Sequence, residues 1–451
     1  MKRRYGVALA LVVVFALAAI PAAGTALPSM PSTSFGPSTG CGCHAALLGQ
    51  WQPSMHAQAL TDPIYLLKLK EGDEATGGAV TPFCIQCHSP IGSMSGDVNE
   101  LGEVEATGVA AEGVTCTFCH RTVGTDAPIG NASQQVNPED VRVAQLKDPQ
   151  APHAAAYSQF HETAEFCGAC HNVDHPTNGS HLEATYTEWS ESPYAAEGIV
   201  CQDCHQTPGA GVTKPNPGKA ASMGPEREHI YSMTFAGGNV GLGDAALAEA
   251  NLKAAATLEL EAPEVQESGE VAVKTTITNV GAGHYLPTGL TEVRQMWLEV
   301  TATDDTGAEL LSERRDFGTV LKGADGSYPV EMWDAAGIQS DDRIAPREST
   351  TNDYSFPMAT GAVTVKATLY YRSCPEEMAE EAGVEIPATT MAEVTKTVFP
   401  TAESKDAGDA AAEAGGDAGA EGGPGALLWI AIVAAVVAVA AAAVVLTRKN
   451  K

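Results

Sequence analysis

The sequence predicts a mainly helical and irregular region followed by an all-β, immunoglobulin-like sandwich, a disordered linker and a C-terminal transmembrane helix. Three observations support this order. Cys/His strings repeat only in the first half of the 451 residues, period-two alternation fills much of the second half, and an uninterrupted apolar run lies near the end. The predicted segments are a signal peptide (1–26), the helical region (30–242), the sandwich (243–400), the linker (401–425), the span (426–447) and a cytoplasmic tail (448–451).

The Cys/His strings are the most specific feature of the chain. The pattern Cys-x-x-Cys-His occurs four times, and a shortened Cys-x-Cys-His precedes it. In such a string two thiols bond covalently to a c-type haem and the adjacent His binds its iron. Converging zinc ligands would need unlike spacings, and disulfides would not explain the His after each pair. The predicted thioether residues are Cys41, Cys43, Cys84, Cys87, Cys116, Cys119, Cys167, Cys170, Cys201 and Cys204, and the motif ligands are His44, His88, His120, His171 and His205.

The number of haems depends on the shortened string. Cys43 stands beside His44 as in the full pattern, but one residue is missing between Cys43 and Cys41. Whether Cys41 also forms a thioether stays open. We therefore expect five haems, with four as the alternative.

Histidines outside the strings are candidates for the sixth iron ligand. Five haems with two His ligands each would use five of the seven that remain, and Met55 and Met233 stay open because Met is the other common sixth ligand. The seven are His56, His153, His161, His175, His181, His229 and His284.

The region after residue 242 changes its pattern. Residues 243–255 have helical periodicity, and the following segments alternate between apolar and polar residues with Gly and Asp turns between them. Expected strands are 257–261, 271–277, 296–303, 363–371 and one near 394–398. This pattern is typical of an antiparallel sandwich. Cys374 stands alone here, as an inert thiol or as one that pairs with another chain.

Both ends of the chain predict export and anchoring. Three basic residues and a short apolar run open the sequence like a secretory signal, with a retained anchor helix as the alternative. The 21-residue apolar run from Ala426 to Leu446 is long enough to span a bilayer, and the Arg and Lys residues behind it place the tail in the cytoplasm. The Ala/Gly/Asp/Glu-rich linker cannot build a core. The net charge of -30 disfavours nucleic acid as a partner.

Several strings resemble the multihaem cytochromes c of the cytochrome c-554/c-prime type. They are residues 51–57, 112–116, 164–172 and 185–205, with 283–289 as a related string in the second region. The resemblance covers about residues 38–240. It implies closely packed, mostly bis-histidine haems that relay electrons. It also implies distal ligands at His56, His161 and His229, and less firmly at His153, His175 and His284, with His181 the weakest candidate.

Three functions follow from these features. The first is a membrane-anchored extracytoplasmic cytochrome that passes electrons to redox partner proteins or an extracellular acceptor without catalysis of its own. The second is an oxidoreductase that acts on a small nitrogen or sulfur compound at one open haem. The third is a self-associating subunit of a haem filament. The His284 loop is expected to reach back and give its imidazole to a haem iron, because flanking glycines let a backbone approach a bulky group. The alternative is a loop histidine that packs against neighbouring aromatic side chains.

Overall fold

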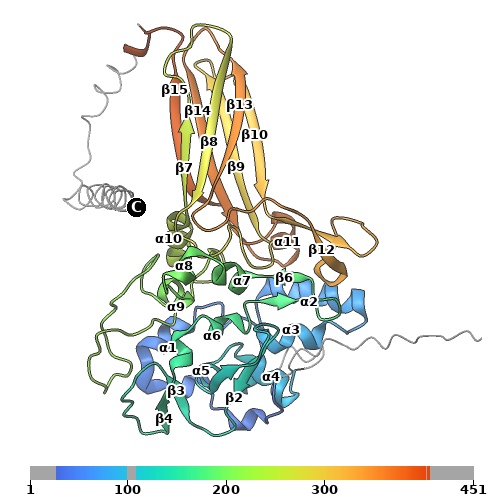
Figure 1. The fold of residues 1–451 in the computed structure, drawn as a ribbon, viewed down its shortest axis with the longest axis vertical. Helices are drawn as coiled ribbons and strands as arrows, with labels where there is room; N and C mark the ends of the chain where they lie inside the picture. The colour runs from blue at the N-terminus through green and yellow to red at the C-terminus, as the bar shows by residue number, and fades with distance from the viewer. Residues whose placement is uncertain (1–26, 99–107, 403, 407–451) are drawn as a thin grey trace, which may run out of the picture.

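The computed structural model describes residues 27–98, 108–402 and 404–406. Figure 1 shows a broad lower body of short helices and loops, from which a column of long strands rises. The predicted signal peptide, span and tail lie outside the described residues, as does most of the predicted linker. Within the described ranges no helix combines the length and apolarity needed to cross a bilayer.

The lower body is built from short helices, as predicted. Pro and Gly residues limit their length: Pro63 opens α2 behind the Asp62 cap, and Gly77 ends it with a φ of 62°. The helices are α1 (Ala45–Trp51), α2 (Pro63–Thr76), α3 (Thr81–His88), α4 (Pro90–Ser95), α5 (Cys116–Cys119), α6 (Glu165–Gly168), α7 (Thr185–Ser190), α8 (Pro193–Ala196) and α9 (Cys201–His205). Single 3-10 turns are η1 (Ser32–Ser34), η2 (Ser38–Gly40), η3 (Gly42–His44), η5 (Gly108–Ala111) and η6 (Gln159–Glu162).

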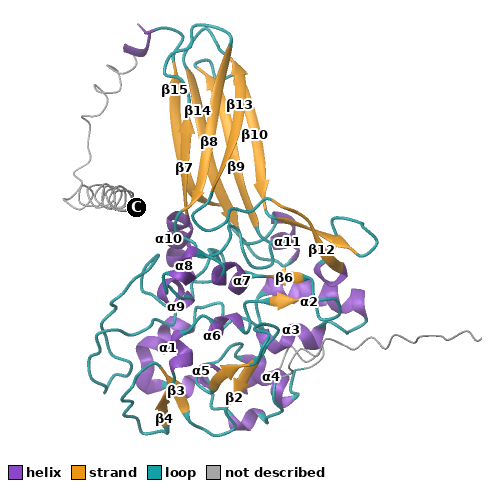
Figure 2. Ribbon diagram, viewed as in Figure 1, coloured by secondary structure: helices purple, strands orange, loops and turns teal. Residues whose placement is uncertain are grey.

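Among the described residues of the lower body, regular sheet is confined to three small two-stranded ribbons (Figure 2). Two are antiparallel and the pair of β3 and β4 is parallel. The strands are β1 (Thr122–Thr125), β2 (Gln134–Val136), β3 (Arg142–Ala144), β4 (Ala155–Tyr157), β5 (Val173–Asp174) and β6 (His181–Glu183).

The column contains two antiparallel sheets, ordered β10-β9-β14-β15 and β13-β8-β7, with a smaller β11-β12 ribbon near the lower body. Helix α10 leads directly into β7. The elements are α10 (Ala245–Ala255), β7 (Ala256–Glu261), β8 (Glu270–Asn279), β9 (Gln295–Asp304), β10 (Glu309–Phe317), β11 (Thr319–Gly323), η7 (Met332–Asp334), β12 (Ala335–Asp341), β13 (Ser349–Pro357), β14 (Val363–Arg372), α11 (Glu376–Glu381) and β15 (Thr389–Val398).

The two sheets share one hydrophobic core. Alternate residues of β7 and β8 are buried, and they meet the inward side chains of β9 and β14. The predicted strands and the helix over 243–255 are confirmed. Strands β10 to β13 were not predicted, because β10 carries mostly exposed residues and β13 mixes polar residues with its buried positions. Cys374 is fully buried in a smaller cluster beside Ile64.

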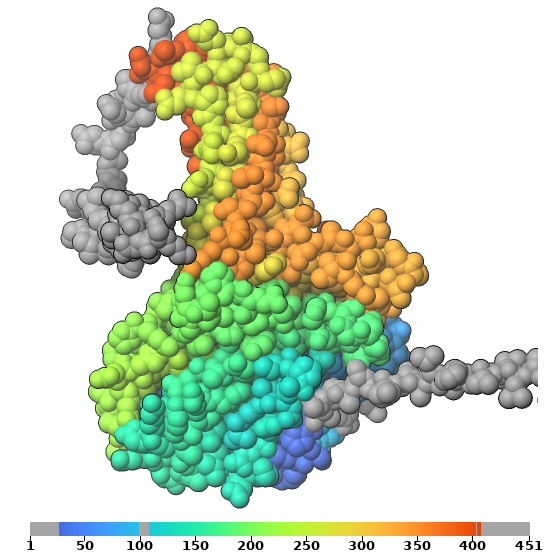
Figure 3. Space-filling view, in the orientation of Figure 1, coloured from blue at the N-terminus to red at the C-terminus, as the bar shows by residue number. Residues whose placement is uncertain are grey.

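The column stands directly on α7 and α8 of the lower body (Figures 1 and 3). Glu188 of α7 and Arg343, both almost fully buried, form an ion pair of 2.5 Å across this boundary. The Tyr194 hydroxyl of α8 donates to the Val280 carbonyl at 2.8 Å. The contact is therefore specific and polar, and it holds the 281–288 loop against the lower body.

Candidate haem sites

Short helical turns present the Cys/His strings. The second Cys and the His follow the first Cys by three and four residues, so all three side chains lie on the same side of a helical turn. Helices α3, α5, α6 and α9 contain all or part of these strings. Turn η3 contains the shortened string except for Cys41, which precedes it as the N-cap. At α5 the Thr115 hydroxyl accepts the Phe118 backbone N–H at 3.1 Å and fixes the start of the turn.

All five motif histidines are oriented through Nδ1. Four of them donate to backbone carbonyls far away in the sequence: His44 to Ala220 at 2.7 Å, His88 to Ala59 at 2.7 Å, His120 to Val143 at 2.8 Å and His205 to Ala236 at 2.8 Å. The fifth, His171, donates to the Glu183 carboxylate at 3.2 Å. Such a bond fixes the tautomer and leaves Nε2 as the metal-binding nitrogen. The arrangement fits haem iron at each string.

Four motif histidines face a second histidine ring. The ring centroids lie 6.4 Å apart for His44 and His153, 6.2 Å for His171 and His56, 5.9 Å for His120 and His161, and 6.3 Å for His205 and His284. A metal-bound imidazole nitrogen lies about 2 Å from its metal and about 1.1 Å from its ring centre, so two imidazoles on one iron have centroids about 6 Å apart. The four pairs thus have the separation that one iron between two histidines requires.

The second rings carry nitrogens that no protein group in the described chain occupies. His56 Nδ1 and His161 Nδ1 are buried without a hydrogen-bond partner. Burial, with a smaller effect from neighbouring histidines, lowers the pKa of His56 to about 3 and that of His161 to about 4. These rings are neutral at physiological pH, which is the form that binds a metal.

His284 reaches its partner across the boundary between the two bodies. Its loop is held by Glu188, which accepts the Tyr285 backbone N–H at 3.1 Å and the Thr288 hydroxyl at 2.7 Å. Gly281 packs so closely that a Cβ there would overlap the Ala254 carbonyl. Gly281 therefore lets the loop pack against the end of α10, and a Cβ at Gly283 would lie 3.4 Å from Trp189 and Tyr194 of the lower body.

His88 differs from the other motif histidines. Its ring stacks on Tyr65 at 3.7 Å, and in the described part of the chain no histidine ring faces it at the separation of the four pairs. The Tyr65 hydroxyl lies beside the thiols of Cys84 and Cys87, is buried, and has no hydrogen-bond partner among the described residues. The string that ends in His88 therefore has no histidine placed as its sixth ligand.

Three of the remaining histidines lie elsewhere. Both ring nitrogens of His175 are engaged, Nε2 with the Trp333 carbonyl at 3.0 Å and Nδ1 with Thr177. His229 Nδ1 accepts the Asn216 backbone N–H at 3.0 Å, and His181 Nδ1 donates to Asp174 at 2.6 Å. The structure thus places the predicted ligands His175 and His229 opposite no motif histidine.

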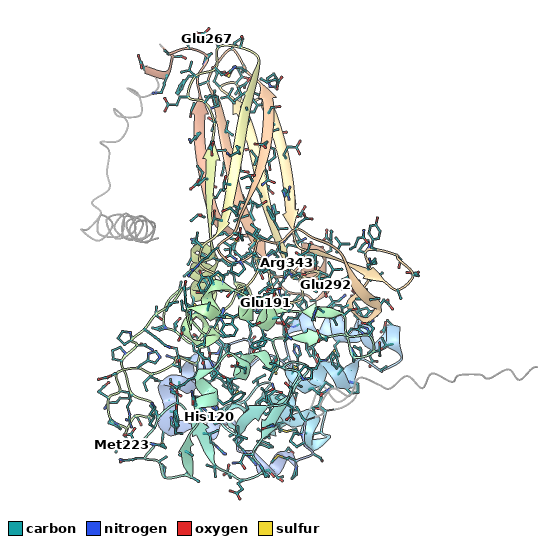
Figure 4. All side chains as sticks on the ribbon, viewed as in Figure 1. His120, Glu191, Met223, Glu267, Glu292 and Arg343 are labelled. Carbon is teal, nitrogen blue, oxygen red and sulfur yellow. The ribbon has the colours of Figure 1, made fainter. Side chains whose placement is uncertain are left out.

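Thiols of different strings lie next to one another. The side chains of Cys41 and Cys116, of Cys87 and Cys170, and of Cys167 and Cys201 are within hydrogen-bond reach. Figure 4 labels His120 in the lower body, where these strings gather, and Arg343 at the boundary above. The thiol of Cys41 is directed toward Cys116 of another string.

Two carboxylates of the site were not predicted from the sequence. Glu183 holds His171: burial would lower the pKa of His171, but the bond and charge of Glu183 outweigh it and raise that pKa to about 9. Glu188 holds the His284 loop. The sequence offered one indication of the contact between His171 and Glu183: the two residues are close together in the chain. The pairing of β5 with β6 brings them together in the structure.

Comparisons with known proteins found one family model and several solved structures that resemble parts of this chain. Residues 41–121 match the family model for cytochrome c554 and c-prime. A penta-heme cytochrome c552 from Thermochromatium tepidum has a similar fold, with a TM-score of 0.61 and 23% identity over 82% of this chain and 100% of that chain. A comparison with curated proteins found no match.

Weaker structural matches cover only about a third of the chain. A putative beta-galactosidase from Bacteroides fragilis matches 32% of this chain and 16% of its own at 13% identity, and a beta-glucuronidase from Bacteroides uniformis matches 32% and 13% at 10% identity. Both TM-scores are 0.17, too low to carry an argument. The match over residues 41–121, the similar fold and the repeated Cys/His strings together support a multihaem cytochrome c.

Proposed function

We propose that the protein is a membrane-anchored, extracytoplasmic relay in which electrons pass between five closely packed haems. When bound, each haem supplies one-electron exchange at its iron. The chain attaches the haems, fixes their axial ligands and sets the polarity around them. The observation that carries the proposal is the set of four histidine pairs with centroids 5.9–6.4 Å apart.

The neighbouring thiols support close packing. Haems attached through adjacent cysteines have their edges near one another. The thiol contacts place the string of Cys41 beside that of Cys116, and the string of Cys167 and Cys170 beside those of Cys87 and Cys201. A route of this kind needs no substrate pocket. The column, which we infer to be an immunoglobulin-like sandwich, supplies one ligand, His284, and serves as a spacer.

The proposed location and partners depend on the ends of the sequence. The signal-like start, the apolar run over 426–446 and the basic residues behind it favour a single-pass anchor with the haems outside the cell membrane. Partners would be redox proteins or an extracellular acceptor. The protein with its chain ended before Gly425 is expected to be soluble and fully loaded with haem. If that protein stays with washed membranes, the anchor is assigned wrongly.

Haem number is tested by intact mass after removal of free haem. The expected mass is that of the processed chain plus five haems, with Cys374→Ser as a control that changes no string. A gain of four haems would remove the shortened string from the set. The mass of the bare chain would refute the whole proposal.

One observation favours the second function, an enzyme with an open haem. His88 has no histidine opposite it in the described chain, so the haem of its string is the candidate for an open sixth position. Carbon monoxide binding to the reduced protein distinguishes the two functions. A pure relay with six-coordinate haems binds none, whereas an open site binds one carbon monoxide per chain. Rapid binding to most haems would contradict the four histidine pairs.

A further inference from the structure

The motif histidines differ in one chemical respect. His44, His88, His120 and His205 each donate Nδ1–H to a neutral backbone carbonyl, whereas His171 donates to a carboxylate.

Glu183 is built into this position. It ends β6, whose pairing with β5 brings it back beside His171, and its side chain is only 16% exposed. The same oxygen that receives His171 also accepts the Thr185 hydroxyl at 3.3 Å. Thr185 is itself within 2.9 Å of Thr288 in the loop that carries His284. The carboxylate is therefore held in place from two sides.

A carboxylate acceptor changes the ligand chemically. Negative charge on the acceptor draws the Nδ1 proton and makes the imidazole a stronger donor to the metal. Stronger donation favours the ferric over the ferrous state, so the potential of that haem falls. A carbonyl acceptor has this effect to a smaller degree because it carries no net charge.

The His171 string also lies at the centre of the thiol contacts. Cys170 contacts Cys87 and Cys167 contacts Cys201. Cys119 of a third string lies close enough to both Cys167 and Cys170 for their charges to interact. A haem attached at Cys167 and Cys170 therefore adjoins three others, more than any other string in the described chain.

We propose that Glu183 acts through His171 as a positioning residue that gives the haem of Cys167 and Cys170 a lower potential than an otherwise equal haem, at the junction of the relay. This inference rests on the proposed relay and deepens it. Electrons that arrive at this haem would leave it readily toward neighbours of higher potential. Glu183 would thus bias the distribution of electrons over the branches.

The test is a spectroelectrochemical redox titration of the haem-loaded protein carrying Glu183→Gln. Glutamine keeps an acceptor oxygen and removes the charge. The ambient potential is fixed near the midpoint potential of the haem of Cys167 and Cys170. There the ratio of reduced to oxidised form of this haem is expected to rise about tenfold, which corresponds to a rise in its midpoint potential of about 59 mV for a one-electron couple. The other components of the titration should overlay the parent curve.

Glu165→Gln is the matched control. Glu165 lies on α6 beside the same string and is hydrogen-bonded to Tyr186 instead of an axial histidine. The substitution Glu165→Gln removes one negative charge near the same haem, and it should shift the redox titration much less than Glu183→Gln does. An equal shift in both variants would show a general charge effect and overturn the specific role of Glu183.

A second variant keeps the inference falsifiable if Glu183→Gln fails to retain its haems. Thr185→Val removes the other donor to Glu183 and leaves the carboxylate to His171 alone, so the potential of the same haem should fall. Unchanged titrations in the available variants would overturn the proposal. The proposed relay function is tested separately from the role of Glu183. A parent protein without low-spin, bis-histidine haem spectra would refute the relay.

Discussion

Arg343→Met should loosen the boundary between the column and the lower body. Arg343 and Glu188 are 8% and 6% exposed and lie 2.5 Å apart. Removal of one partner of a buried ion pair costs about 3–5 kcal/mol, because the other charge is left uncompensated. Glu188 keeps its bonds from the Tyr285 backbone N–H and the Thr288 hydroxyl, so we expect the lower end, about 3 kcal/mol.

The loss should be visible in two measurements. A cost of about 3 kcal/mol lowers the melting temperature by roughly 6–12 °C for a domain of this size. Because Glu188 also anchors the loop that carries His284, the low-spin signal of one haem should weaken before the others during thermal unfolding. Differential scanning calorimetry together with haem absorbance follows both effects.

Arg347→Met provides the matched control at the same boundary. Its pair with Glu197 is 44% and 47% exposed, so its loss should cost at most about 1 kcal/mol. The double variant Arg343→Met with Glu188→Gln should recover part of the stability, since no charge is then left buried. Equal melting temperatures for Arg343→Met and Arg347→Met would refute the reasoning.

Three further predictions concern single side chains. His284→Met should leave every haem attached and raise the potential of one haem only, because Met ligation raises potentials; a titration that overlays the parent curve, with unchanged low-spin spectra, would remove His284 from the ligands. Burial raises the pKa of Glu292 from 4.5 to about 7, so its contribution to stability is present below pH 4.5 and lost as pH rises through 7. Glu292→Gln should therefore raise the melting temperature at pH 8 by an amount that corresponds to up to about 3 kcal/mol and change little at pH 4.5; an equal gain at both pH values would contradict this. Cys41→Ala should keep the haem at Cys43. The intact mass of this variant gives its number of covalent haems, and the loss of one haem would show that the thiol of Cys41 is needed for attachment.

The sequence was sufficient to predict the haem strings and several strands, because both depend on residues that are close together in the chain. In a Cys-x-x-Cys-His string the spacing alone places the two thiols and the imidazole near one haem. In β8 and β14 the alternation of apolar and polar residues predicts a strand with one buried face. Strands β10 and β13 were missed because β10 carries mostly exposed residues and β13 has polar residues around its buried Phe356. For β10, the run Glu313–Asp316 is exposed throughout, so no apolar period marks the strand.

Ligand pairing could not be read from the sequence because it is decided by tertiary contacts. His44 meets His153 and His205 meets His284 across long stretches of chain, and the sequence ranked His229 above both distal residues. His175 resembles them in its position near a string, yet its ring nitrogens are occupied by Trp333 and Thr177. Only the tertiary structure distinguishes a histidine that faces a motif histidine from one whose ring nitrogens are used in local hydrogen bonds.

The distribution of apolar residues connects the haems to the fold itself. The largest hydrophobic cluster of the described chain has 22 buried residues and lies in the column, whereas two clusters confined to the lower body, one around Ile91 and one around Ile85, contain only six and four. A body this large with such small cores cannot offset its conformational entropy by side-chain burial alone. Covalent haems, four of them with a histidine pair, would supply the missing apolar surface and cross-links. Under the proposed function the histidine pairs would stabilise the fold as well as relay electrons, and His284 would ligate a haem of the lower body from the column.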